Sequence, residues 1–289
     1  MQFIGFIFFR LALVIFYLIP FPILYKLSDG VAWLLRVVIK YRIKVVQANL
    51  EKAFPEKTES ERAIILIDSY KNLADIFLES LKGMTMNWNR PNERYVFSNP
   101  EILKPYTQKN LATIHIATHC GNWEWATYSY PLFFKERIVA FYKPLSNKLM
   151  DAFVLKKRSS TRLVLADIKN TPEHFTNNLA EGNDVAFVLV SDQSPTSKNS
   201  IWVNFFGIET AFLHGTQFYA LKYSLPVFYL STKRLKRGWY ALSLELITEN
   251  ANNEPENYVT QKYAELLERD IRNAPSDWLW THKRWKLTK

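Results

Sequence analysis

The sequence predicts an α/β fold, with a mixed central sheet flanked by helices and a hydrophobic N-terminal helix that anchors the chain to a membrane. Three observations lead to this prediction. They are an apolar stretch at residues 3–25, a long helical pattern at 59–84, and beyond it an alternation of short apolar runs with helical stretches. We therefore expect a membrane anchor at residues 1–30 and a single larger domain at 31–289.

The apolar stretch at residues 3–25 is interrupted by Arg10, Pro20 and Pro22. A bilayer span needs about 20 apolar residues, but a charge and two nearby prolines weaken a straight crossing. Two membrane interpretations therefore stay open. In one the segment spans the bilayer with Arg10 snorkelling to an interface, and in the other it lies in one leaflet. A buried core helix is the third alternative.

Positive charge dominates the chain, with 37 Lys and Arg against 27 Asp and Glu. This balance predicts attraction to anionic lipid or to acidic partner proteins. Nucleic acid is excluded as a partner because no module fingerprint is present and the basic residues are scattered among apolar stretches. Several basic residues follow the apolar segment directly, and such residues stay cytoplasmic, which places the body of the protein on that side. They are Lys26, Arg36, Lys40, Arg42 and Lys44.

The pattern at 59–84 opens with polar capping residues and carries apolar residues at helical spacing, with Gly83 as a stop signal. Short apolar runs predict strands at 111–118, 137–142, 162–166, 184–191, 201–205, 226–232 and 239–246. Helices are expected at about 123–133, 147–158, 172–180, 214–223 and 256–273. The polar segment 249–257 is the expected loop and site of disorder.

A candidate catalytic pair lies where the first strand of this series meets the following helix. His119 falls at the strand end and Glu124 in the first helical turn, and Gly121 with Asn122 supplies the sharp turn between them. This spacing can return the Glu124 carboxylate to one imidazole nitrogen, while the other nitrogen faces a cleft and acts as a general base. A structural histidine is the alternative.

The residues 119–124, HCGNWE, resemble the signature of the bacterial lipid A biosynthesis acyltransferase family and of the wider HX4D/E glycerolipid acyltransferases. Further segments look like the other blocks of that family in the same order: 44–57, 142–151, 191–195, 204–207 and 260–286. There are departures. Cys120 replaces an apolar residue, Lys143 replaces an arginine, and a glycine-containing stretch after the basic helix is missing, so that Arg158 and Arg162 both remain candidates for the functional arginine.

The resemblance implies a glycerolipid-acyltransferase-like catalytic domain on the cytoplasmic face of the bacterial inner membrane. It implies transfer of a fatty acyl chain from acyl carrier protein to a hydroxyl of a lipid A precursor. Two alternatives stay open: another membrane glycolipid or aminolipid as acceptor, and a non-catalytic lipid-binding relative. Acyl carrier protein and membrane lipid are the expected partners, and no cofactor is expected besides the acyl donor.

For the site, the resemblance implies His119 as base and Glu124 as its orienting carboxylate. Substrate-binding roles are expected for Asn122, Lys143, Arg158, Asp192 and Gln193, the two cations holding phosphate of donor or acceptor. The alternatives are a turn cap at Asp192 and a solvated helix face at Arg158. Direct attack by the acceptor is the simpler prediction than an acyl intermediate on Cys120.

Two further groups of residues complete the expectations. The five histidines lack metal-ligand spacing, and so no metal site is expected. A C-terminal cluster mixes aromatic with basic side chains, which suits either contact with lipid headgroups or packing in the core. It consists of Trp278, Trp280, His282, Arg284 and Trp285.

Overall fold

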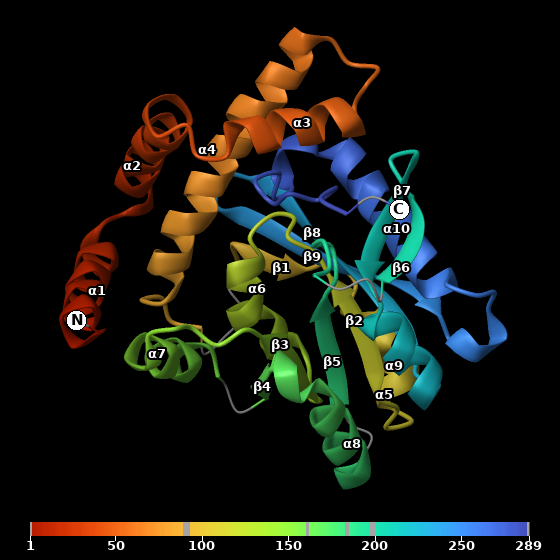
Figure 1. Ribbon diagram of the computed structural model, residues 1–289. Helices are drawn as coiled ribbons and strands as arrows, with labels where there is room; N and C mark the ends of the chain where they lie inside the picture. Colours follow the sequence, from red (N-terminus) through yellow and green to blue (C-terminus); the bar gives the residue numbers. More distant parts are fainter. Residues whose placement is uncertain (1, 89–92, 160–161, 183–184, 197–199, 288) are drawn as a thin grey trace.

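The computed structural model describes residues 2–289 apart from 89–92, 160–161, 183–184, 197–199 and 288. Within this part the strands form a seven-stranded sheet in the order β1-β9-β8-β2-β5-β3-β4 (Figure 1). β8 and β9 pair antiparallel, and every other neighbouring pair in the sheet is parallel. The predicted mixed sheet with flanking helices is thus confirmed.

The strands of this sheet are β1 (Tyr95–Phe97), β2 (Thr113–Ala117), β3 (Arg137–Tyr142), β4 (Leu163–Asp167), β5 (Val185–Val190), β8 (Val227–Lys236) and β9 (Trp239–Thr248). A separate antiparallel hairpin pairs β6 (Ser200–Phe205) with β7 (Ile208–Leu213). The α-helices are α1 (Gln2–Leu18), α2 (Phe21–Trp33), α3 (Ile43–Ala53), α4 (Glu59–Gly83), α5 (Lys104–Thr107), α6 (Trp123–Ser129), α7 (Lys148–Arg158), α8 (Thr171–Glu181), α9 (Gly215–Tyr223) and α10 (Tyr258–Asn273).

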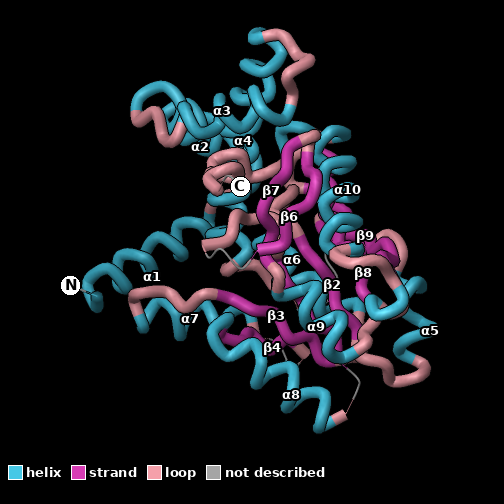
Figure 2. Tube along the Cα trace, turned by 45° about the vertical axis from the view of Figure 1, so that its right-hand side comes forward, coloured by secondary structure: helices cyan, strands magenta, loops and turns pink. Residues whose placement is uncertain are grey.

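The apolar N-terminal segment is divided at Pro20 into α1 and α2, so the expected single anchoring helix is wrong in that respect. Proline has no N–H for the helical ladder and disfavours helix in the residue before it. Both helices lie at one side of the molecule, where α1 contacts α4 and α7, and α2 contacts α4 (Figures 1 and 2). Among the described residues, no helix has both the length and the apolar character needed to cross a membrane.

Most predicted elements are present with shifted ends, although residue 184 of one predicted strand lies outside the described residues. The prediction missed β1, β7, α3 and α5. The segment 249–257 contains the short 3-10 helix Ala251–Asn253, and it is held by a hydrogen bond from Thr248 Oγ1 to Glu254. The N-cap of α4 is Thr58, in a capping box with Glu61.

The two faces of the sheet carry different cores. On one face Phe187 of β5 packs with Phe175 of α8, in a cluster that also holds residues of α9 and α10. On the other face Trp125 of α6 packs with Tyr240 of β9. Because side chains alternate along a strand, each strand contributes to both cores. The carboxyl ends of the central parallel strands open between these two layers.

Candidate active site

The register between β2 and β5 places His119 beside Asp192. These neighbouring parallel strands pair Ala117 with Val190, and each of the two site residues lies two positions beyond its strand's paired end. Ligands bind outside the carboxyl ends of such strands in α/β sheets. The two side chains therefore meet at the edge of the sheet where a site is expected, although 73 positions separate them in sequence.

Asp192 holds His119 by two contacts. His119 Nδ1 lies 2.6 Å from Asp192 Oδ1, and the His119 backbone N–H donates to Asp192 Oδ2 at 2.8 Å. A buried carboxylate accepts, so Nδ1 carries the proton and Nε2 keeps its lone pair, which accepts from the amide of Gln193. Gln193 Nε2 lies 3.3 Å from His119 Nε2 on that side. The imidazole is thus oriented as a base whose Nε2 faces the cleft.

Asp192 and His119 each stabilise the charged form of the other. Burial by itself lowers the pKa of His119, but the charge and hydrogen bond of Asp192, with the charge of Glu124, raise it overall. Burial raises the pKa of Asp192, yet the His119 charge and the hydrogen bonds from His119 and Trp278 lower that pKa to about 2. Asp192 is therefore ionised across the physiological range and stabilises an imidazolium.

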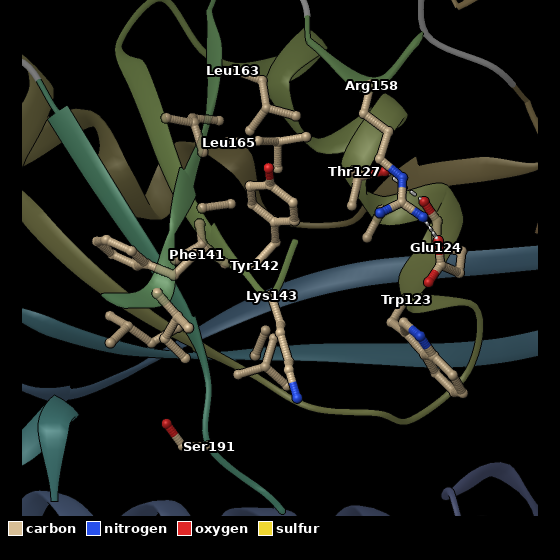
Figure 3. A pocket seen from close by; sticks show the side chains of 18 of the residues that line it. Trp123, Glu124, Thr127, Phe141, Tyr142, Lys143, Arg158, Leu163, Leu165 and Ser191 are labelled. Atoms are coloured by element: carbon tan, nitrogen blue, oxygen red, sulfur yellow. Dashed lines mark hydrogen bonds and ion pairs between the residues drawn. The ribbon is translucent and has the colours of Figure 1, made fainter. Parts of the chain in front are cut away.

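The expected contact between Glu124 and His119 is corrected by the structure. Glu124 projects from the first turn of α6 and forms an ion pair with Arg158, at the C-terminal end of α7 (Figure 3). No hydrogen bond joins Glu124 to His119 in the described part of the chain. The register of β5 brings another carboxylate to the imidazole, and the basic end of α7 binds Glu124. Glu124 acts on His119 through its charge alone.

Asn122 is fully buried and so cannot bind substrate, which corrects another prediction. Its Oδ1 accepts from the Trp125 N–H at 2.8 Å and caps α6, while its Nδ2 donates to Glu79 at 2.7 Å. The neighbouring Gly121 has a φ of +57°, and a side chain there would collide with Thr232. These two residues build the sharp turn that the sequence predicted, with Asn122 as its buried anchor.

A cavity of about 1060 Å³ extends from His119 along the sheet. Its polar lining residues include Glu124, Lys143, Arg158 and Gln193. Figure 3 shows Arg158 and Glu124 pointing toward each other, the Lys143 side chain extending away from them, and the apolar side chains of Leu163 and Leu165. Of the two candidate arginines, Arg158 lines this cavity, whereas the guanidinium of Arg162 donates to the Phe134 carbonyl at 2.6 Å. The geometry therefore selects Arg158.

The C-terminal aromatic cluster packs inside the molecule. Trp278 is 4% exposed and Trp280 1% exposed, so these rings are buried and not available to lipid headgroups. The Trp278 Nε1–H donates to Asp192 Oδ2 at 2.8 Å, which brings a residue from the far end of the chain into the site. Sequence reasoning missed this role, because an indole donor carries no local signal for its acceptor.

Cys120 is unsuited to form an acyl intermediate. Its side chain is buried, and burial raises the pKa of its thiol well above the ordinary value. A protonated buried thiol is a poor nucleophile. His115 is a structural histidine that contacts Thr113 and Tyr130, and burial lowers its pKa to about 3. No cluster of three or more potential metal-ligating His, Cys, Asp or Glu side chains occurs in the described part of the chain.

Residues 2–287 match the model of a family described as bacterial lipid A biosynthesis acyltransferase. A palmitoleoyltransferase of lipid A biosynthesis from Escherichia coli K12 is 24% identical over 273 residues, which cover 93% of this chain and 86% of the relative. A lauroyltransferase of lipid A biosynthesis from the same organism is 23% identical, covering 93% of this chain and 87% of the relative. A lipid A biosynthesis acyltransferase from Haemophilus influenzae is 23% identical, with 93% and 86% covered. With a match that runs over almost its whole length, this chain belongs to the bacterial lipid A biosynthesis acyltransferase family.

Proposed function

We propose that this acyltransferase moves a fatty acyl chain from the thioester of acyl carrier protein to a hydroxyl of a lipid A precursor, with His119 as general base. The observation that carries the proposal is the hydrogen-bonded His119–Asp192 pair at the mouth of a largely apolar cavity. The family match supports the reaction class, and the geometry of the base supports a hydroxyl as acceptor.

In this mechanism His119 Nε2 accepts the proton of the acceptor hydroxyl, while the hydroxyl oxygen forms a bond to the thioester carbonyl carbon. Asp192 stabilises the imidazolium that results. The carbon–sulfur bond then breaks, and the imidazolium returns its proton to the leaving thiolate. The products are an ester and a free thiol. Gln193, whose amide lies beside the base, is suited to hold the hydroxyl or the developing oxyanion.

The acyl chain fits the apolar part of the cavity. Its wall includes Ile138 and Ala140 of β3, Leu163 and Leu165 of β4, and Val188 of β5. A volume of about 1060 Å³ is at the upper end of ligand pockets, which typically hold about 300–1,000 Å³. An extended hydrocarbon chain gains stability there by leaving water.

Two cations at the rim suit the phosphate groups of the substrates. Arg158 forms an ion pair with Glu124, which fixes the guanidinium at the cavity wall. Lys143 is exposed and lines the same cavity. We assign them to phosphate of the donor's phosphopantetheine or of the acceptor. The net charge of +10 matches an acidic carrier protein and a phosphorylated lipid.

The N-terminal helices are proposed to lie in one leaflet of the inner membrane, with the catalytic domain on the cytoplasmic face. Large apolar side chains of α1 face outward, with Phe8 67% and Leu18 71% exposed. Exposed Lys26, Lys40 and Arg42 follow along the chain. Exposed apolar area beside basic residues is the combination that binds an anionic membrane surface.

A panel of acceptors tests the function. The purified full-length protein is incubated with acyl carrier protein charged with chains of several lengths and with either a lipid A precursor or an aminolipid. Mass spectrometry of the lipid products follows. The proposal predicts one added acyl ester on the lipid A precursor. Acylation of the aminolipid alone would establish the alternative acceptor, and no transfer to any acceptor would favour a lipid-binding relative.

A further inference from the structure

We propose that Trp278 is a positioning residue for acyl transfer, whose indole N–H fixes the second oxygen of Asp192 and so orients the carboxylate that holds His119. This inference rests on the proposed function. Asp192 Oδ1 contacts the His119 ring, while Oδ2 accepts from the His119 backbone N–H and from Trp278 Nε1, both at 2.8 Å. The three donors leave the carboxylate a single orientation. Trp278 is the only one of its described donors that comes from outside the His119 residue.

The segment that carries Trp278 is itself tied to the catalytic turn. Trp278 forms a β-bridge with Cys120, and the Gly121 N–H donates to the Asp277 carbonyl at 3.0 Å. Farther along, His282 Nε2 accepts from the Ser194 N–H at 2.8 Å. The C-terminal segment therefore contacts both loops of the site, the one carrying His119 and the one carrying Asp192. These contacts hold the indole in place beside the carboxylate.

Removing the indole donor has a defined electrostatic consequence. The positive end of the N–H dipole partly offsets the charge of Asp192. The two contacts from His119 remain and keep the carboxylate beside the ring, but its second oxygen is held less firmly. Without the dipole, the negative potential at His119 deepens and its imidazolium is favoured. The other ionisable groups whose charges act on this pair stay unchanged: Glu124 with Arg158, Cys120, Tyr263, His282 and Arg284.

Trp278→Phe tests the proposal, with Trp280→Phe as its matched control. Trp280 is equally buried in the same segment and packs against Trp278 at 4.8 Å between ring centroids, but its N–H donates to the Pro275 carbonyl. Acyl transfer from acyl carrier thioester is measured for both variants and the wild type between pH 5.5 and 9. For Trp278→Phe we expect a roughly tenfold to hundredfold lower kcat, the size of effect seen when the supporting hydrogen bonds of metal-binding histidines are removed.

The pH profile separates positioning from a general loss of stability. In the pH profile of kcat/KM, we expect the acid limb of Trp278→Phe to move to higher pH. The loss of acyl transfer relative to the wild type is then larger at pH 6 than at pH 8. Trp280→Phe keeps the limb of the wild type. If Trp278→Phe has the same limb as Trp280→Phe, or a limb at lower pH, the proposal is overturned. Absence of acyl transfer in the wild type would instead refute the proposed function.

An isostere of tryptophan provides a second test in case the phenylalanine variant misfolds. Incorporation of β-(3-benzothienyl)alanine at position 278 replaces the indole N–H by sulfur and keeps the size of the ring. Thermal unfolding monitors the fold of each protein. The isostere is expected to show the same upward move of the acid limb at nearly wild-type stability, and a wild-type profile from the folded isostere would reject the role of the N–H.

Discussion

The hydrogen bond between His119 Nδ1 and Asp192 Oδ1 determines how a proton moves in this site. With Nδ1 committed to the carboxylate, Nε2 alone is available to the acceptor hydroxyl. Glu124 neighbours the imidazole in sequence, yet it pairs with Arg158 and influences His119 only through space. The proposed base thus depends on two carboxylates in different ways, by contact with Asp192 and by the charge of Glu124.

Asp192→Asn is expected to lower kcat by about 10²–10⁴-fold with little change in KM. The amide cannot stabilise the imidazolium and can present its NH₂ group to Nδ1, which favours the wrong tautomer. Steady-state kinetics with acyl carrier thioester measure the effect. Asp167→Asn is the control, since that carboxylate ends the edge strand β4 and accepts from the Lys169 N–H, without contacting His119. Nearly equal kcat values for the two variants would remove Asp192 from the mechanism.

The rate of acyl transfer should fall as pH drops through a value above 6.5, the ordinary pKa of histidine. His119 must be neutral to accept a proton, and it is protonated below its pKa. The Asp192 ion pair outweighs burial and raises that pKa overall, so the acid limb moves to higher pH. The pH dependence of kcat/KM measures the pH at which this acid limb lies. A limb below pH 6.5 would mean that burial dominates at His119.

Among single residues, the sequence predicted the sharp turn at Gly121 but assigned the wrong carboxylate as the partner of His119. A strand end followed by Gly121 and a helix start predicts a His119 that faces a cleft, and the structure has His119 in the wall of the cavity. The carboxylate was assigned by closeness in sequence, whereas the pairing of Ala117 with Val190 decides which side chain reaches the ring. Register between strands far apart in the chain depends on the whole core, which a local pattern does not contain.

Among the elements, α6 has an unusually buried start. Its N-cap Asn122 also donates to Glu79, a carboxylate in α4 that accepts from Tyr25 and Tyr240 as well. Burial raises the pKa of Glu79 despite these donors. The helix α2, the long helix α4 and the turn before α6 are therefore joined through one buried carboxylate.

Asn122→Ala should reduce the free energy of unfolding by about 2.5–4 kcal/mol. The loss combines a helix cap worth about 1 kcal/mol with a buried hydrogen bond to a carboxylate worth about 1.5–3 kcal/mol. Urea unfolding of the purified variants gives the value. Asn147→Ala is the matched control. Asn147 caps α7 at a half-buried position and donates to the carbonyl of exposed Gln2 and not to a buried carboxylate, so its loss should cost only about 1 kcal/mol. Equal losses would show that the contact with Glu79 adds nothing.

Elements with a strong local pattern were predictable, and short or context-dependent ones were not. The long helix α4 has apolar residues at helical spacing, but Gly83 serves packing as well as termination, because a side chain there would meet the Trp125 ring. The strand β7 begins after a turn in which Phe206 and Gly207 both have positive φ. Its sequence, IETAFL, lacks the alternation that marks a half-buried strand.

For the whole molecule, the exposed apolar face of α1 predicts binding to membranes. Phe8→Asp combined with Leu11→Asp should weaken flotation with vesicles containing anionic lipid, because two large exposed side chains become charged. Ile64→Asp is the control, since Ile64 is 60% exposed on α4, away from the apolar N-terminal segment. Undiminished flotation of the double variant would place the membrane contact elsewhere.

The central claim is that His119 is the base for acyl transfer, and single-turnover kinetics of His119→Gln test it most directly. Purified wild type and variant are mixed with radiolabelled acyl carrier thioester and a lipid A precursor, and the acylated lipid is quantified against time while thermal unfolding verifies the fold. The account predicts that the folded variant binds both substrates and transfers the chain about 10²–10⁴-fold more slowly. Transfer by the folded variant at the wild-type rate would contradict it.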